Sequence, residues 1–136
     1  MEKRFLKKII AQTPKDLQII SAFCSEAKVN LDGVKYLPKN KLFLLSVERL
    51  VKESEKNNKK INSIIKFEFI DSAKSININT NNPDLPLKLL AINHFKKENN
   101  YEILLLLSEN GIITLSAEII EVTLEDQKIN DKSNQL

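Results

Sequence analysis

The sequence predicts an α+β fold in which a mainly antiparallel sheet, curved or closed into a partial barrel, packs against one N-terminal amphipathic helix. Only one stretch has helical spacing of apolar residues, and the rest of the chain forms short apolar or alternating runs between turn signals. No strand-helix-strand rhythm of a parallel sheet occurs. A chain of 136 residues with ordinary composition can bury one core. We therefore expect a single domain over residues 1–126 and a flexible C-terminal tail over 127–136.

The helix is predicted to begin at Thr13, whose side chain can accept a hydrogen bond from the Asp16 backbone. Pro14 suits the first helical position. The apolar residues that follow recur at spacings of three and four, which places them on one stripe facing the core. These residues are Leu17, Ile20, Phe23, Cys24 and Ala27.

Turn signals divide the middle of the chain into two strand pairs. Asp32-Gly33 and residues 38–41 precede the apolar run at 42–47, which predicts a hairpin. Residues 52–60 contain no apolar side chain and are predicted to be a mobile surface connection. The alternating runs at 65–69 and 76–78 are predicted to be a second pair, with a turn at 71–74 between them.

The last third of the chain predicts two more hairpins. The sheet breaks at 81–86, resumes over 87–95, and turns at 96–100 before the run at 101–107. Asn110-Gly111 favours the positive φ values of a tight turn into the strand that follows. Residues 118–125 change the parity of the alternation, which fits either a β-bulge or a switch to helix.

The composition points to a protein of the cytoplasm. The single cysteine, Cys24, cannot form an internal disulfide, and it is expected to pack in the core as an unreactive thiol. The basic start lacks a secretory pattern, and the longest apolar run, residues 103–107, is too short to span a bilayer. We expect no membrane association, and the sequence leaves a monomer and a homodimer open.

The charge is distributed unevenly along the chain. Residues 1–60 hold 14 basic and 7 acidic side chains, whereas residues 61–136 hold 7 basic and 11 acidic ones. This asymmetry allows a basic face for nucleic acid but does not favour it over a mixed surface, because strands from both halves can interleave. Tyr36 beside Lys35, Lys39 and Lys41 is the best candidate for an exposed aromatic within a basic patch.

No pattern of catalysis or of metal or cofactor binding is present. The sole histidine, His94, would need a carboxylate or nucleophile from another strand to act in an enzyme. Two glycines are too few for a phosphate-binding or dinucleotide loop. An acidic set near the C-terminus lacks the spacing of a calcium loop and is better interpreted as a solvated strand edge. Its members are Glu118, Glu121, Glu125 and Asp126.

Three segments together resemble an uncharacterised family. Residues 34–43, with Tyr36-Leu37-Pro38 before a basic, Phe-containing strand, are similar to the domain-of-unknown-function family 2948 of alphaproteobacteria. Residues 89–92 and the stretch from Gly111 to Asp126 are similar to further segments of it, although the family's usual Trp-Glu pair is absent. The resemblance implies a cytoplasmic protein of alphaproteobacterial origin and assigns no activity.

The functional prediction is therefore a non-enzymatic binding or accessory domain that recognises a protein partner or a small ligand, without a cofactor. The candidate binding residues are Lys35, Tyr36, Lys39 and Lys41, because ordered loops on a sheet often carry recognition. Two alternatives stay open. One is a nucleic-acid-binding domain that uses the same lysines, and the other is a small enzyme built on His94.

Overall fold

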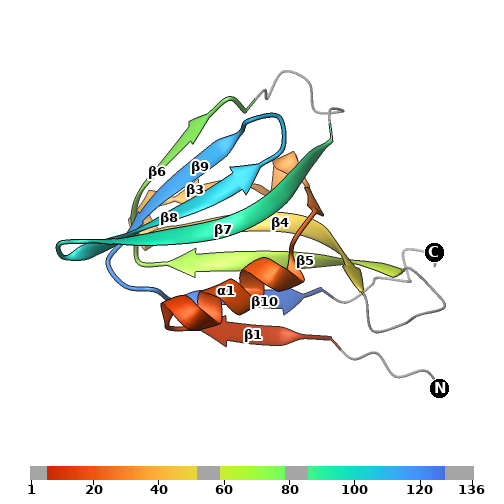
Figure 1. Cartoon of the computed structure of the whole chain (residues 1–136), viewed down its shortest axis with the longest axis horizontal. Coiled ribbons are helices and arrows are strands. Elements are labelled where there is room, and N and C mark those ends of the chain that lie inside the picture. Colours follow the sequence, from red (N-terminus) through yellow and green to blue (C-terminus); the bar gives the residue numbers. More distant parts are fainter. Residues whose placement is uncertain (1–5, 52–58, 79–85, 128–136) are drawn as a thin grey trace.

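The computed structural model describes residues 6–51, 59–78 and 86–127, which form one sheet and one helix (Figure 1). The predicted α+β class, with a mainly antiparallel sheet and a single N-terminal helix, is confirmed. The elements are β1 (Lys8–Ala11), α1 (Pro14–Phe23), β2 (Ala27–Val29), β3 (Lys35–Leu37), β4 (Leu42–Val51), β5 (Lys59–Glu68), β6 (Ile70–Ile76), β7 (Leu87–Lys97), β8 (Asn100–Leu107), β9 (Ile112–Ala117) and β10 (Val122–Asp126). Two short 3₁₀ turns flank β3, namely η1 (Leu31–Gly33) and η2 (Pro38–Asn40).

The ten strands of the described ranges all belong to one antiparallel sheet. Their order is β1-β10-β5-β4-β2-β7-β8-β9-β6, and β3 pairs with β4 beside this path. The sheet is open, because β1 and β6 lie at its two ends and each pairs with a single neighbour. The described part of the chain therefore forms no closed barrel, and β3 and β6 each keep one edge without a partner strand.

The helix begins as the sequence predicts. Thr13 Oγ1 accepts a hydrogen bond from the Asp16 backbone N–H at 3.1 Å, and Pro14 occupies the first turn. Leu17 and Ile20 are buried where α1 packs against β7 and β1. Ala27 of the predicted stripe is also buried, but it lies on β2, because the helix ends at Phe23.

Three predicted hairpins are present, namely β3–β4, β7–β8 and β8–β9. The turn of the last one differs in detail from the prediction. The positive φ values fall on Glu109 (60°) and Asn110 (63°), whereas Gly111 has no positive φ. The left-handed pair of residues therefore lies one position earlier than the Asn-Gly signal indicates.

The predicted pairing of residues 65–69 with 76–78 is wrong. β5 pairs with β4 and β10, whereas β6 pairs with β9, and residues 71–74 lie within β6 rather than in a turn. The chain bends instead at Phe69, which has a positive φ of 60° and separates the two strands. Residues 71–74 have a turn-like polar composition because β6 is an exposed end strand.

Residues 118–125 form neither a bulged continuation of β9 nor a helix. β9 ends at Ala117, the chain bends at Glu118 and Ile119, and β10 starts at Val122 between β1 and β5. The change of parity in the sequence marks two separate strands on different parts of the sheet.

Some predictions fall on residues outside the described ranges. Of the mobile connection predicted at 52–60, residues 52–58 lie outside the described ranges, and Lys59 and Lys60 belong to β5. Of the predicted break at 81–86, only Pro86 is within the described ranges. Of the predicted tail at 127–136, only Gln127 is described, and its backbone N–H donates to the Asn62 carbonyl at 2.8 Å. Among the described residues, no helix has the length and apolar character that crossing a membrane requires.

Candidate functional site

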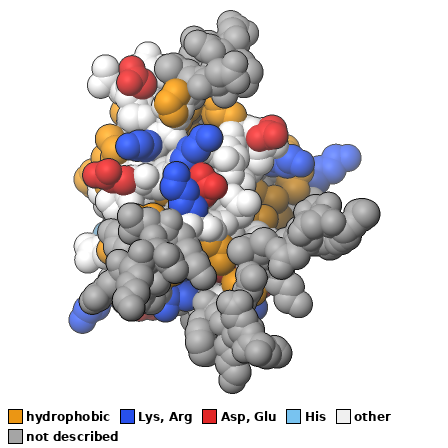
Figure 2. Space-filling model, turned by 90° about the vertical axis from the view of Figure 1, so that its right-hand side faces the viewer, with side chains coloured by type: hydrophobic (Ala, Val, Ile, Leu, Met, Phe, Trp, Pro, Cys, Tyr) orange, Lys and Arg blue, Asp and Glu red, His pale blue; other side chains and the backbone are white. Residues whose placement is uncertain are grey.

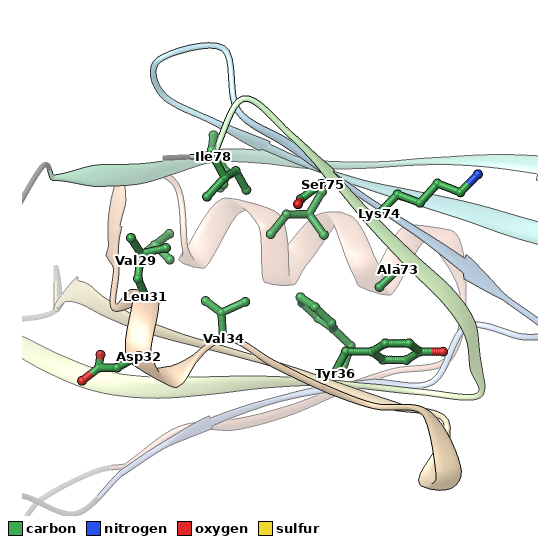
Figure 3. Close-up of a pocket in the computed structure, with 12 residues that line it drawn as sticks. Val29, Leu31, Asp32, Val34, Tyr36, Ala73, Lys74, Ser75 and Ile78 are labelled. Carbon is green, nitrogen blue, oxygen red and sulfur yellow. The ribbon is translucent and has the colours of Figure 1, made fainter. Parts of the chain in front are cut away.

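The candidate site is a pocket of about 520 Å³ between the unpaired edges of β3 and β6 (Figure 3). Part of its wall is formed by β2, β4, β8 and β9 on the inner face of the sheet, the face that carries the buried core side chains. The rest comes from β3, β6 and η1. Nine of its lining residues are apolar or aromatic. These are Val29, Leu31, Val34, Tyr36, Phe43, Ala73, Ile78, Leu107 and Ile113.

Tyr36 sets the position of β6 against β3 at one end of the pocket. Its hydroxyl donates to the Ile70 carbonyl at 3.3 Å, and the Ile70 N–H donates to the Lys41 carbonyl at 2.9 Å. The Tyr36 ring packs on Phe43 with a centroid distance of 6.5 Å, within the usual range for aromatic pairs. These contacts join β6 to the β3–β4 hairpin, although β3 and β6 do not pair.

Three polar residues complete the lining, and their side chains differ in direction. Ser75 lies directly opposite Ile113 in the β6–β9 register, so its side chain is on the inner face of the sheet. Figure 3 shows the Lys74 ammonium and the Asp32 carboxylate directed away from the apolar side chains that line the pocket. Among the described lining residues, the polar side-chain atoms on the inner wall are therefore the Ser75 hydroxyl and the Tyr36 hydroxyl, and the latter already donates to the Ile70 carbonyl.

The size and the mostly apolar lining are those that ligand pockets commonly have. Ligand pockets commonly enclose about 300–1,000 Å³ and are mostly apolar with few polar groups. The lining contains no histidine or cysteine and no pair of carboxylates. No cluster of three or more metal-ligating side chains occurs in the described ranges.

The structure separates the four predicted binding residues. Lys35 and Lys39 are exposed, whereas Tyr36 is half-buried in the pocket wall rather than free to stack on a base. Lys41 Nζ lies 2.7 Å from Glu118 Oε2 and 3.2 Å from Asp71 Oδ1. Hydrogen bonds to Glu118 and then Asp71 raise the pKa of the Lys41 amine above its ordinary value. Tyr36 alone of the four lines the pocket.

His94 lies on β7, a strand that contributes none of the described lining residues of the pocket. It is half-buried, is paired with Ile103, and shares the inner face with Ile92. Within the described chain its ring makes no hydrogen bond and no ion pair. No described side chain is therefore bonded to the ring as a partner in acid–base chemistry.

The acidic set near the C-terminus is dispersed. Glu118 pairs with Lys41, Glu121 accepts a hydrogen bond from Gln12 at 3.0 Å, and Glu125 is exposed. Asp126 departs from the predicted solvated edge, because it is buried and accepts hydrogen bonds from Arg49, from Ser63 and from the Lys7 backbone.

The Arg49–Asp126 pair and its neighbours join three strands, β4, β5 and β10, to the segment that precedes β1. Arg49 Nε and Nη2 donate to the two carboxylate oxygens at 3.0 and 2.8 Å. Burial alone would raise the pKa of the Asp126 carboxyl, but the hydrogen bonds and charge of Arg49 and the other donors hold it below its ordinary value. Cys24 is fully buried nearby, and burial raises the pKa of its thiol to about 12, as expected for an unreactive core thiol.

The comparison with protein families agrees with the resemblance seen in the three segments. A family model described as a protein of unknown function, DUF2948, matches residues 7–136. The chain belongs to the DUF2948 family. No curated protein and no solved structure matches the chain. Membership of DUF2948 therefore assigns no activity.

Sequence reasoning identified Tyr36 but not the pocket around it. The lining is contributed by positions from Val29 to Ile113, and their inward parity is the same as that of ordinary core residues. The pocket would have been predictable only if the strands with an unpaired edge, β3 and β6, had been identified from the sequence. The wrong pairing predicted for the residues of β6 prevented this. The Arg49–Asp126 pair was also missed, since its partners are 77 positions apart.

Proposed function

We propose that this member of DUF2948 is a non-enzymatic binding domain that holds a small, mostly apolar ligand in the pocket between β3 and β6. The observation that carries the proposal is an apolar pocket of about 520 Å³ bounded by two strands, β3 and β6, each of which pairs on one edge only. An apolar ligand there would cover side chains that the open sheet leaves partly exposed, which is favourable by roughly 25 cal/mol per Å² of apolar surface removed from water.

The alternatives have weaker support. Of the lysines expected to contact nucleic acid, Lys41 is paired with Asp71 and Glu118. The aromatic candidate, Tyr36, lies in the pocket wall with its hydroxyl bonded to the Ile70 carbonyl. On the face shown in Figure 2, basic and acidic side chains are mixed. In the described ranges, no hydrogen bond or ion pair joins a second group to the His94 ring that a catalytic role would require. A protein partner stays an alternative to the small ligand as the recognised species.

We further infer a cytoplasmic location, with a monomer or a homodimer as the oligomeric state. The location is supported by the single buried thiol of Cys24, because proteins of reducing compartments keep such cysteines unpaired. The open ends of the sheet leave both oligomeric states available.

The test is binding of N-phenyl-1-naphthylamine, an uncharged aromatic probe that fluoresces in apolar surroundings. Ser75→Phe places a large ring on the inner wall at an exposed end strand, where it occupies pocket volume without entering the core. Asn62→Phe is the matched control, because Asn62 is exposed on β5 and lines no described pocket. We expect saturable binding to the wild type and to Asn62→Phe, and roughly tenfold or greater weakening in Ser75→Phe, a loss of about 1.4 kcal/mol.

Circular dichroism and thermal unfolding would establish that both variants are folded. Absence of saturable binding to the wild type would overturn the proposal, and so would equal affinity of a folded Ser75→Phe variant. A second blocking variant, Ala73→Leu, provides an independent check from the same wall.

A further inference from the structure

We infer that the ligand of this pocket is an uncharged amphiphile, with an apolar body and a single neutral hydrogen-bonding group that reaches Ser75. The inference rests on the proposed function and defines the chemical class of the ligand. Its basis is the placement of the few polar groups around an otherwise apolar wall.

The inner wall has no charged side chain directed into it that could neutralise a buried charge. Val29, Phe43, Leu107 and Ile113 are at most 4% exposed and form its floor. An ionised group placed against them without a partner would be strongly penalised by the loss of its hydration. The part of the ligand that enters the pocket is therefore neutral.

The charged residues at the rim do not select one sign of charge. Lys74 and Asp32 carry opposite charges, and both charged groups are directed away from the apolar lining in Figure 3. Lys74 is on the opposite face of β6 from Ser75, because its partner in the register is Thr114 rather than Ile113. A carboxylate or an ammonium head at the opening meets one attractive and one repulsive group, so neither sign is favoured.

Ser75 marks the place of the ligand's polar group. Its hydroxyl is on the inner face beside Ile113, and within the described chain it has no hydrogen-bond partner. A hydroxyl both donates and accepts, so it can pair with an alcohol, a carbonyl or an amide of a neutral ligand. β6 also has one edge without a partner strand, which adds backbone donors and acceptors near the same position.

The experiment compares 1-octanol, octanoate and octylammonium as competitors of N-phenyl-1-naphthylamine at pH 7.5. The three compounds have the same chain and differ in the charge of the head group. We expect 1-octanol to displace the probe at concentrations about tenfold or more below those of both ions. Ser75→Ala should weaken 1-octanol about threefold to tenfold, as loss of one hydrogen bond predicts, once the competition is corrected for the measured affinity of the variant for the probe.

Variants of the rim separate a neutral ligand from a charged one. Lys74→Ala and Asp32→Ala should each change the 1-octanol competition by less than about twofold, because their charged groups do not reach the wall. If octanoate displaces the probe at concentrations equal to or below those of 1-octanol, and Lys74→Ala weakens octanoate, the inference would be overturned in favour of an anionic ligand. If octylammonium displaces the probe as well as 1-octanol does, and Asp32→Ala weakens octylammonium, the inference would be overturned in favour of a cationic ligand. In either case saturable probe binding would leave the proposed function standing, whereas failure of the probe itself would remove both.

Discussion

Arg49 and Asp126 show how single residues hold this open sheet together. Their side chains are 3% and 0% exposed, and Ser63 donates a third hydrogen bond to the carboxylate at 2.6 Å. β4, β5 and β10 are joined through this carboxylate, and the Lys7 backbone N–H joins the segment before β1 at 2.9 Å. A buried pair of this kind contributes little relative to apolar residues, but removal of one partner leaves the other charge buried and unpaired.

Asp126→Asn should lower the free energy of unfolding by about 3 to 5 kcal/mol at pH 7, because it removes the carboxylate charge that faces the buried Arg49 guanidinium. The pKa of Asp126 is lower in the folded chain than its ordinary value of 3.8, so the pair stabilises the fold above that value. This contribution is lost as the pH falls through 3.8 toward the lower pKa of the folded state. Urea unfolding across this range should show a smaller dependence on pH for Asp126→Asn than for the wild type.

The double variant Arg49→Met/Asp126→Leu is the control for this prediction, since it replaces both charges with apolar groups. It should recover part of the stability lost in Asp126→Asn, because no buried charge is left, although Ser63 and the Lys7 backbone lose their acceptor. An Asp126→Asn variant as stable as the wild type at pH 7, or one with an unchanged acid profile, would show that the pair does not stabilise the fold.

At the scale of elements, η1 connects the β2 strand to the β3 edge of the pocket and depends on Gly33. A Cβ at Gly33 would overlap the Ser46 side chain on β4, so this glycine is required by a close approach rather than by a positive φ. Gly111 has more room, since its added Cβ would lie 3.3 Å from Leu107 Cβ. The two glycines therefore provide a matched comparison.

Gly33→Ala should destabilise the fold by about 1 to 3 kcal/mol, because the added methyl group overpacks the contact with Ser46. It should also weaken N-phenyl-1-naphthylamine binding, since Leu31 and Val34 on either side of Gly33 line the pocket. Gly111→Ala should have the smaller effect on both quantities. Thermal unfolding and probe titration of the two variants measure them, and equal effects would contradict the proposed role of the η1–β4 contact.

The elements that the sequence predicted correctly have local signals. Thr13 and Pro14 define the start of α1 through a cap within three residues, and the β7–β8 and β8–β9 hairpins join neighbouring segments. The errors lie where strand pairing is nonlocal. β6 joins β9 rather than β5, and the bend at Phe69 has neither glycine nor proline to mark it.

For the whole molecule, the order of the strands determines where a ligand can bind. Sequence alternation identifies inward positions, but it does not show which inward positions face a partner strand and which face an opening. Tyr36 was predicted from its basic neighbours to be an exposed aromatic residue. In the structure it lies in the pocket wall and bonds to the Ile70 carbonyl. Ser75 has no sequence pattern that distinguishes it from the other serines of the chain.

The most direct test of the central claim is a titration of the methyl-labelled protein with 1-octanol, followed by carbon–proton NMR correlation spectra. The pocket hypothesis predicts saturable shift changes concentrated on the methyl groups of Val29, Leu31, Val34, Ile78, Leu107 and Ile113. Buried methyl groups away from the pocket, such as those of Leu17 and Leu124, should remain unchanged. Changes spread over the surface, or no saturable change at the lining methyl groups, would contradict a ligand site between β3 and β6.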